Sequence, residues 1–279
     1  MIRTLKHLTY TLRTELATIN EIIANVDSYY ISWSKVKTDK DTGLPLTDAD
    51  GNHRTRQLNS TKIELKRIQK RILTLLMSHV EIPTYAFGGV QKKDNIKNAK
   101  YHQGNKYIFT TDLRSFFPSI SHNSVFEVYC NNGYSPTVAR ILTKLTTYKY
   151  QLPQGVPTST LLALLAFKPT GDKLYDYALQ HNLKFSIFVD DITISSKVDF
   201  KHLVPDILDI IVSAGYTISH NKTHYSTKNP IITGIKCQNN RIKLPQSTYK
   251  RISKLSKDSN SYKGLIMYRK RIYSNTKSF

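Results

Sequence analysis

Two adjacent carboxylates, Asp190 and Asp191, stand between two apolar, β-branched runs, and this stretch limits the possible folds more than any other. The flanking runs, residues 185–189 and 192–195, are typical of two short strands with the acidic pair at the turn between them. Successive strand residues point to opposite faces, but a turn can direct neighbouring carboxylates toward one point. Two carboxylates held among apolar side chains repel each other unless a hard cation lies between them. Asp is also common in ordinary hairpin turns, so the stretch predicts either a metal-binding turn or a plain one.

The charge balance of the chain favours a polyanionic partner. Across 279 residues there are 41 Lys and Arg against 20 Asp and Glu, which gives a net charge of +21. A surplus of this size exceeds what solubility requires and points first to nucleic acid. Eighteen Tyr and ten Phe add rings that can stack on bases or fill a core.

Several other classes of protein are disfavoured. Cys130 and Cys237 are the only cysteines, so the sequence offers neither a disulfide framework nor a zinc cluster. The amphipathic start lacks the apolar segment of a secretory signal, and the longest apolar run, residues 161–167, is too short to cross a bilayer. We therefore expect a cytoplasmic protein that has no membrane partner and can bury a sizeable core.

The spacing of apolar residues predicts a mixture of helices and strands. We expect helices over residues 1–26, from Ser60 to about residue 76, and over 94–102, 122–131, 136–147, 157–180, 201–214 and much of the last thirty-odd residues. We expect strands over 29–37, 54–58, 106–113, 216–219, 231–235 and 241–244, in addition to the acidic hairpin. The sequence thus predicts an α+β protein.

A third carboxylate, Asp112, ends the apolar strand predicted over 106–113. A two-metal site needs carboxylates from separate strands that bridge ions roughly 3.5–4 Å apart. Phosphate oxygens and water can complete the octahedral coordination that Mg²⁺ prefers. Asp112, Asp190 and Asp191 together therefore predict a centre for nucleotidyl transfer.

Three stretches occur in the order of motifs A, B and C of reverse transcriptases, and they most resemble those of bacterial retron and other defence-associated enzymes. They are Asp-Leu-Arg-Ser-Phe-Phe-Pro-Ser-Ile at 112–120, Pro-Gln-Gly-Val-Pro-Thr-Ser at 153–159 and Phe-Val-Asp-Asp at 188–191. Other stretches resemble the fingers motif (56–58 with 65–69), the Asn-Ala-x-x-His element of retron enzymes (98–102), motif D (221–223) and motif E (232–234). The resemblance spans roughly residues 29–245.

The resemblance implies a right-hand polymerase fold with fingers, an antiparallel palm sheet and a short helical thumb. The fingers would occupy residues 1–104 and the palm residues 105–236. A truncated thumb and C-terminal tail would occupy residues 237–279. The resemblance also implies that the three carboxylates bind two Mg²⁺ ions, or Mn²⁺ as the alternative, with the main-chain carbonyl of Leu113 assisting.

Residues around the predicted metal centre receive roles from the same resemblance. Arg56 would hold the triphosphate of the incoming dNTP, with Lys35 or Lys37 as a helper. Gln154 and Gly155 would lie against the dNTP and the template base. The plainer interpretation of Gln154 is a hydrogen bond within its loop.

Two further positions bear on the chemistry and on the choice of substrate. Lys222 would lie near the leaving pyrophosphate as a candidate general acid, since bound phosphate keeps a lysine protonated until transfer. Phe117 would be a steric gate beneath the sugar that excludes a ribose 2′-hydroxyl, and it thereby disfavours an RNA-dependent RNA polymerase. The plainer interpretations are a surface cation for Lys222 and a core ring for Phe117.

The resemblance as a whole implies an RNA-directed DNA polymerase that adds dNMPs and makes a DNA product. Its template would be a dedicated, structured non-coding RNA that the basic surface holds by phosphate contacts and shape, in bacterial anti-phage defence. The short thumb implies that RNA, a partner protein, a second subunit or a second copy of the chain completes the nucleic-acid clamp.

Two alternatives remain open. In the first, the same site performs protein-primed or template-independent DNA synthesis. This alternative rests on Thr160 and Leu164, where motif B usually has Pro and Asn, and on candidate primers in the tail, namely Tyr262, Tyr268 and Tyr273. In the second, the chain is a catalytically silent RNA-binding scaffold subunit. The intact carboxylates argue against this second alternative.

Overall fold

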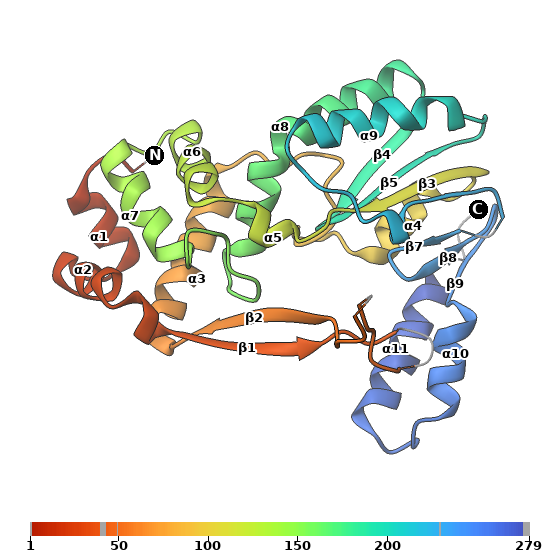
Figure 1. The fold of residues 1–279 in the computed structure, drawn as a ribbon, viewed down its shortest axis with the longest axis horizontal. Helices are drawn as coiled ribbons and strands as arrows, with labels where there is room; N and C mark the ends of the chain where they lie inside the picture. The colour runs from red at the N-terminus through yellow and green to blue at the C-terminus, as the bar shows by residue number, and fades with distance from the viewer. Residues whose placement is uncertain (1, 40–42, 49, 229, 276–279) are drawn as a thin grey trace. The chain divides into compact units, whose positions relative to one another are not determined.

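The computed structural model describes residues 2–39, 43–48, 50–228 and 230–275. The chain divides into two compact units, which Figure 1 draws together and which are described here one at a time. Unit 1 comprises Met1–Lys37, Pro45–Pro83 and Ser115–Pro169, and unit 2 comprises Thr38–Leu44, Thr84–Arg114 and Thr170–Phe279.

Unit 1 is built from helices and one long β-hairpin. Its elements are α1 (Leu5–Leu12), α2 (Leu16–Ala24), η1 (Val26–Tyr29), β1 (Tyr30–Val36), β2 (Thr55–Thr61), α3 (Ile63–His79), α5 (Phe116–Ser119), α6 (His122–Asn131), α7 (Pro136–Thr146) and the first part of α8 (Ser159–Gln180). One apolar face of each larger helix is buried, including Leu8, Leu12, Ile19, Leu65, Ile72, Leu76, Val138 and Leu142. Burial of these side chains is the main stabilising contribution to the helical layer.

The hairpin of unit 1 is fixed at its base by the buried amide of Gln69. Thr61 Oγ1 donates to Gln69 Oε1 at 3.0 Å, and Gln69 Nε2 donates to the Leu145 carbonyl at 3.0 Å and to Tyr30 Oη at 3.3 Å. The amide thus connects β1 and β2 with α3 and α7. A buried polar side chain whose hydrogen bonds are all made fixes the register of such a junction.

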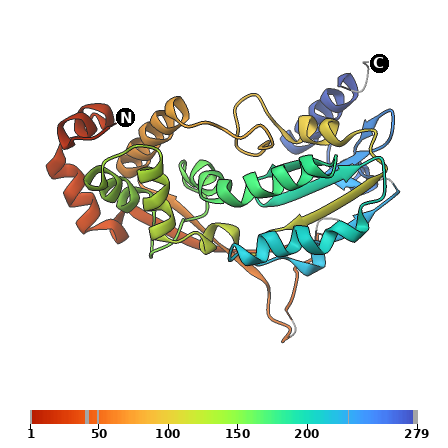
Figure 2. The same cartoon turned by 90° about the horizontal axis from the view of Figure 1, so that it is seen from above.

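Unit 2 contains an antiparallel sheet in the order β4-β5-β3-β6. Its elements are α4 (Asn95–His102), β3 (Tyr107–Asp112), the rest of α8, β4 (Lys184–Phe188), β5 (Asp191–Ser196), η2 (Lys201–Leu203), α9 (Val204–Ser213), η3 (His220–Lys222), β6 (His224–Ser226), β7 (Ile231–Ile232), β8 (Ile235–Cys237), β9 (Ile242–Lys243), α10 (Gln246–Ser253) and α11 (Asn260–Ser274). Figures 1 and 2 show the unit 2 part of α8 and the whole of α9 along one face of the sheet. Phe109, Phe185, Ile187, Ile192 and Ile194 share one face of the strands and are buried.

A second apolar cluster in unit 2 joins α4 to the small sheet β7-β8-β9 and to the last two helices. Its buried members include Ile96, Ala99, Ile108, Ile232, Ile235, Ile242, Leu244, Ile252 and Ile272. The side chains of Asp94 and Arg271 form an ion pair between the start of α4 and the end of α11. Helices α10 and α11 are therefore part of the packed body of unit 2.

The predicted α+β class is confirmed, and most predicted elements are present. Ser60, expected to cap a helix, instead lies in β2, because the strand continues to Thr61 and α3 begins at Ile63. The strand expected over 216–219 is reduced to a bridge between Ile218 and Leu113, whereas β6, which pairs with β3, was not expected. The assignment of fingers, palm and thumb stays a prediction, and residues 276–279 of the predicted thumb lie outside the described part of the chain.

Within the described residues, no helix has both the length and the apolar character that crossing a bilayer would demand.

Candidate active site

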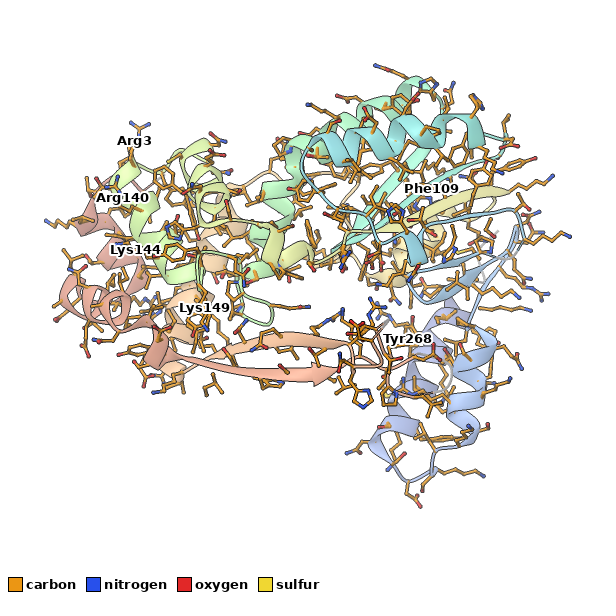
Figure 3. All side chains as sticks on the ribbon, in the orientation of Figure 1. Arg3, Phe109, Arg140, Lys144, Lys149 and Tyr268 are labelled. Carbon is orange, nitrogen blue, oxygen red and sulfur yellow. The ribbon has the colours of Figure 1, made fainter. Side chains whose placement is uncertain are left out.

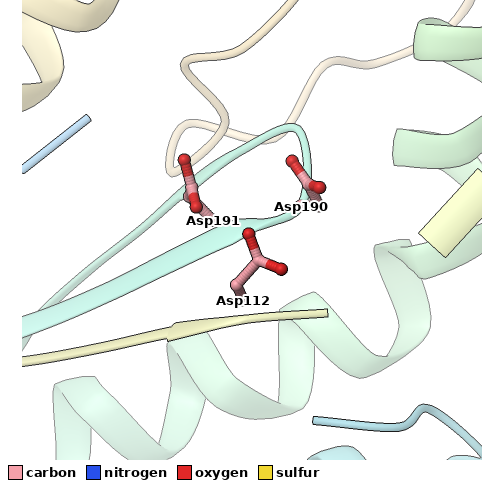
Figure 4. A group of neighbouring side chains, drawn as sticks. All are labelled: Asp112, Asp190 and Asp191. Carbon is pink, nitrogen blue, oxygen red and sulfur yellow. The ribbon is translucent and has the colours of Figure 1, made fainter. Parts of the chain in front are cut away.

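The three predicted metal ligands lie together at one end of the unit 2 sheet (Figure 4). Asp112 ends β3 and Asp191 begins β5, and these two residues are directly opposite each other in the antiparallel register. Asp190 belongs to the turn that joins β4 to β5. One carboxylate oxygen from each of the three lies within 4.8 Å of the others. Like charges directly opposite in a sheet are destabilising, so this arrangement requires a compensating positive charge.

The turn that carries Asp190 has an unusual backbone. Phe188 pairs with Asp191, which leaves Val189 and Asp190 as a two-residue loop. Val189 has φ of 62°, a left-handed conformation that glycine adopts readily and a β-branched residue rarely does. Strain of this kind persists where the surroundings impose it.

A preceding segment of unit 2 supports the turn. The Phe87 amide donates to the Ile187 carbonyl at 2.8 Å, and the Ile187 amide donates to the Tyr85 carbonyl at 3.0 Å. Gly88 then packs directly on the turn, because a Cβ at this position would come within 2.4 Å of the Val189 amide nitrogen. Gly88, which has no side chain, permits this close contact between the two backbone segments.

The electrostatics of the cluster fit a cation. Burial first, and then the charges of Asp190 and Asp112, raise the pKa of Asp191 to about 7. A hydrogen bond with Asp112 raises the pKa of Asp191 as well, whereas the Lys222 ammonium lowers it. The three carboxylates supply the oxygen ligands that hard divalent ions prefer, and they repel one another without such an ion.

The main chain of Leu113 is bound to the turn that carries Asp190. Its amide donates to the Asp190 carbonyl at 3.0 Å. The assisting role of the Leu113 carbonyl stays a prediction.

Lys222 lies beside the carboxylates. Its Nζ is 2.6 Å from Asp112 Oδ2 in an ion pair, while the lysine side chain keeps 58% of its surface exposed. Ser219 holds the same aspartate from two sides, because its Oγ donates to Asp112 Oδ1 at 3.2 Å and its amide donates to the Asp112 carbonyl at 2.8 Å. Sequence reasoning missed Ser219, which lies just before the motif D stretch at 221–223.

The Asn-Ala-x-x-His element forms a buried hydrogen-bond chain behind the hairpin. His102 Nδ1 is 2.7 Å from Ser195 Oγ and His102 Nε2 is 2.7 Å from Ser186 Oγ, so the ring bridges β4 and β5. Ser186 donates to Asn98 Oδ1, and Asn105 donates to Ser195.

The directions of these hydrogen bonds determine the tautomer of His102. Because the Ser186 hydroxyl proton goes to Asn98, His102 Nε2 must be the donor toward Ser186, and His102 Nδ1 accepts from Ser195. Burial, together with the Lys184 ammonium, lowers the pKa of His102 to about 3. The histidine is therefore a neutral structural residue.

In unit 1, the predicted triphosphate residues lie on the β1–β2 hairpin. Lys35 and Arg56 are direct cross-strand partners, so both side chains project from one face of the ribbon. Two cations in this arrangement repel each other, and an anion between them would relieve the repulsion. Lys37 continues the pairing, with its amide donating to the Arg54 carbonyl at 2.8 Å. The register therefore favours Lys35 as the partner of Arg56.

The motif B loop lies against the edge of the same hairpin. The Asn59 amide donates to the Gln154 carbonyl at 2.8 Å. Gly155 has φ of 111°, and a Cβ at this position would meet the Asn59 carbonyl at 2.6 Å. The structure thus brings Gln154 and Gly155 together with the strand that carries Arg56. Gly155 has a structural role in this contact, and its contact with the dNTP and the template base stays a prediction.

Phe117 lies in α5 of unit 1, whereas the carboxylates lie in unit 2. Phe116 beside it is buried and packs edge-on against Phe167 at 5.9 Å, while Phe117 is only half-buried. The two rings therefore have different environments, as expected. The role of Phe117 as a steric gate stays a prediction.

Two of the three candidate primer tyrosines of the tail are engaged in packing. Tyr262 and Tyr268 pack against the second apolar cluster, and Tyr268 also accepts a hydrogen bond from Asn95 at 2.5 Å. Tyr273 is exposed, and its Oη lies 2.5 Å from Tyr249 Oη.

Taken together, unit 2 presents an antiparallel sheet that carries carboxylates at the ends of two adjacent strands, as a site for nucleotidyl transfer would require. The family profile described as reverse transcriptase (RNA-dependent DNA polymerase) matches residues 40–263. The chain belongs to the reverse transcriptase family, and its fold is the right-hand fold of that family.

The similarity extends to bacterial retron enzymes. The chain is 30% identical over 204 residues to the retron Ec86 reverse transcriptase of Escherichia coli, covering 71% of this chain and 63% of that protein. It is 35% identical over 149 residues to the retron Se72 reverse transcriptase of Salmonella heidelberg (strain 579083-10), covering 53% and 39%. It is 28% identical over 259 residues to the retron Ec48 reverse transcriptase of E. coli, covering 83% and 62%. The matches thus span less than two thirds of the length of each relative.

Proposed function

We propose that the chain is an RNA-directed DNA polymerase that adds dNMPs at the Asp112–Asp190–Asp191 cluster. The observation that carries this proposal is the opposed pair Asp112 and Asp191, whose proximity is unfavourable unless cations neutralise it. Membership of the reverse transcriptase family and the similarity to retron reverse transcriptases support the same activity.

The residues that would hold the metal ions are the three carboxylates and the Leu113 carbonyl. Two divalent ions, Mg²⁺ or alternatively Mn²⁺, would supply activation of a 3′-hydroxyl and neutralisation of the triphosphate when bound. The chain's own contribution is to fix the ligands. Ser219 orients Asp112, the Val189 turn presents Asp190, and the β3–β5 register presents Asp191.

Lys222 would act with the carboxylates. Its ammonium group forms an ion pair with Asp112. A cation at Asp112 would compete with this ion pair and release the exposed lysine toward a phosphate. The released lysine could then donate a proton to the leaving pyrophosphate.

Unit 1 would supply the substrate contacts. Arg56, with Lys35 across the ribbon, would hold the triphosphate, and Gln154 and Gly155 would contact the dNTP and the template base. Phe117 would exclude the ribose 2′-hydroxyl. In this assignment, Arg56 and Lys35 belong to the fingers, and the predicted fingers (1–104) and the predicted palm (105–236) each contribute residues to both units.

The template would be a dedicated, structured non-coding RNA, and the biological setting would be anti-phage defence. A net charge of +21 supports extensive phosphate contacts. The retron enzymes among the relatives support the choice of a dedicated RNA.

The test is synthesis by the protein purified from its native locus together with its bound RNA. With Mg²⁺ and all four dNTPs, we expect labelled product that requires RNA and resists RNase digestion. The Asp190→Ala, Asp191→Ala double variant should make none. Product whose sequence is unrelated to any bound RNA would contradict templated synthesis, and product that protease shifts in size would favour protein priming.

A second arm tests the sugar selectivity. The Phe117→Ala variant should incorporate NTPs at least about tenfold more readily relative to dNTPs, since removal of the ring opens space beneath the sugar. Phe116→Leu is the matched control at the neighbouring buried ring and should leave the ratio unchanged. An unchanged ratio in Phe117→Ala would remove the steric-gate assignment without affecting the polymerase assignment.

A further inference from the structure

A column of unpaired cations runs along α7 in unit 1. Arg140 and Lys144 are four residues apart and therefore lie on the same helix face, about 6 Å apart along the axis. Arg3 lies at the start of the column, because Ser135, which caps α7, donates through its side chain to the Arg3 carbonyl at 2.8 Å. Lys149 follows the end of the helix. Figure 3 shows these four side chains one below another along this side of the unit.

The column has a uniform sign of charge. All four cations are exposed, and none has an ion-pair partner within the described part of the chain. Residues 128–171, which include α7 and the turn after it, contain no Asp or Glu at all. Helix α7 also buries its opposite face deeply, so it holds the cations on a rigid support. Such a stripe attracts a polyanion whose charges are arranged along a line.

A strained turn presents an exposed aromatic ring at the end of the column. Tyr148 and Gln151 exchange backbone hydrogen bonds of 2.9 and 3.2 Å, so Lys149 and Tyr150 form the two-residue loop of a hairpin. Both loop residues have positive φ, 50° and 61°, as a type I′ turn requires. Asn-Gly is the favoured pair at these positions, whereas this chain has two long side chains. The Tyr150 side chain is 85% exposed, so packing does not explain its presence.

The turn is held rigidly and lies beside the column. The His122 amide donates to the Tyr150 carbonyl at 2.9 Å, and the Leu152 amide donates to the Ile120 carbonyl at 3.0 Å. The ring of Tyr150 meets that of His122 edge-on at 6.3 Å. His122 Nδ1 also lies 2.7 Å from Oγ1 of Thr147, the residue that follows α7, so the histidine connects the turn to the end of the helix that carries the column.

We propose that the α7 column and Tyr150 form a binding track for an unpaired stretch of nucleic acid. The cations Arg3, Arg140, Lys144 and Lys149 would contact successive phosphates, and the Tyr150 ring would stack on a base. A preformed aromatic ring next to a line of cations is the combination that binds single strands without reading their sequence. Nothing in the track distinguishes a 2′-hydroxyl, so RNA and DNA are both candidate strands.

The inference rests on the proposed function only for the presence of a nucleic acid near the protein. It is tested as binding, in the absence of dNTPs and of divalent ions, so loss of polymerase activity would not affect its outcome. The probes are a fluorescent unstructured RNA oligonucleotide, a DNA oligonucleotide of the same sequence and the corresponding RNA duplex.

The decisive variant is Lys149→Asn, Tyr150→Gly, which replaces the loop with the pair that its backbone favours. We expect this variant to melt at a higher temperature than the wild type but to bind the single strands about 10-fold more weakly. A stabilised protein that binds less cannot have lost its affinity by unfolding. Tyr150→Phe should retain the wild-type affinity. If the Asn-Gly variant binds as tightly as the wild type, the stacking role is wrong.

The role of the column is tested by its effect on how strongly the binding affinity depends on salt concentration. Arg140→Ser, Lys144→Ser removes two phosphate contacts and should lower the slope of log affinity against log salt by about 1.4 for a single strand. Lys66→Ser, Lys70→Ser on α3 is the matched control, because it removes two exposed cations at the same helical spacing in the same unit. An equal change of slope in both variants would overturn the proposal, as would a preference for the duplex probe.

Discussion

At the scale of single residues, the candidate site is a cluster of groups whose charges oppose folding. Asp112 and Asp191 face each other across two strands, and Asp190 adds a third carboxylate in a strained turn. One lysine, Lys222, partly compensates from an exposed position. If the cluster binds cations as proposed, the same groups that lower the stability of the fold would supply the metal ligands, a trade common at active sites.

Asp191→Asn should stabilise the metal-free protein and abolish synthesis. With a chelator present, the amide removes the repulsion across β3 and β5, so the free energy of unfolding should rise by about 1 kcal/mol. Polymerase activity should fall by at least about 10³-fold, because loss of a metal ligand removes several kcal/mol of transition-state stabilisation. Urea unfolding and primer extension measure the two effects.

The control for this prediction is Asp209→Asn, an exposed carboxylate on α9. It should change neither the stability nor the activity. A metal-free Asp191→Asn protein that is less stable than the wild type would show that the carboxylate makes favourable contacts that outweigh the repulsion.

His102 should make the stability fall as the pH decreases. Its pKa in the folded state is about 3, below the value of about 6.5 in an unfolded chain, so the unfolded state binds more protons between these values. The contribution of the neutral His102 ring to the free energy of unfolding is complete above pH 6.5. As the pH falls from 6.5 toward 3, this free energy decreases by up to about 1.4 kcal/mol per pH unit.

The comparison with His102→Gln isolates this contribution. At pH 7 the variant should be about 1–3 kcal/mol less stable, since the buried serines lose partners. Between pH 7 and pH 5 the deficit should shrink, because only the wild type loses the histidine contribution. The free energy of unfolding from urea titrations at both values measures this, and a deficit that stays constant would mean that His102 titrates normally in the folded protein.

At the scale of elements, much of the fold and the centre of the site follow from the sequence. The proximity of Asp112, Asp190 and Asp191 could be predicted because Asp112 ends one strand, Asp191 begins another and Asp190 lies in the turn before it, and the neighbours of each residue specify these strands. The contacts of Ser219 and Gly88 could not, because they depend on how segments distant in the chain meet. Ile218 made only a bridge, and β6 was missed, because strands of two or three residues carry too little periodicity to be recognised.

Gly88→Ala should disturb the catalytic hairpin through backbone contact alone. The new methyl would lie 2.4 Å from the Val189 amide nitrogen and 2.8 Å from the Phe188 carbonyl carbon, and neither backbone atom can move without shifting the turn. We expect a loss of about 1–3 kcal/mol in stability and at least a tenfold loss of activity. Thermal melting and primer extension test both.

Gly264→Ala is the matched control, because a Cβ at this position in α11 would meet no atom within 4 Å. The substitution should leave the activity unchanged and raise the stability by up to about 1 kcal/mol through helix propensity. Full activity in Gly88→Ala would mean that the turn tolerates a shift, and that the segment of residues 85–88 does not position Asp190.

At the scale of the whole molecule, the cations that would attract nucleic acid are separate from the carboxylates that would perform the chemistry. The positive charges are spread over both units, whereas the described carboxylate cluster is confined to one end of one sheet. In the proposed function, long-range attraction of a nucleic acid would thus be independent of the carboxylates, although synthesis would require both.

The Asp190→Asn, Asp191→Asn variant should therefore bind structured RNA at least as well as the wild type while making no product. If six to ten phosphates are contacted, the affinity of both proteins should fall by about 10³- to 10⁵-fold between 50 and 200 mM salt. Filter binding at several salt concentrations gives the slope, and primer extension on the same preparations gives the activity. A much shallower slope would show that the charge surplus serves another purpose. Weaker binding by the variant, in a chelator and at constant fold stability, would show that the carboxylates themselves organise the RNA site, and catalysis and binding would then no longer be separable in this protein.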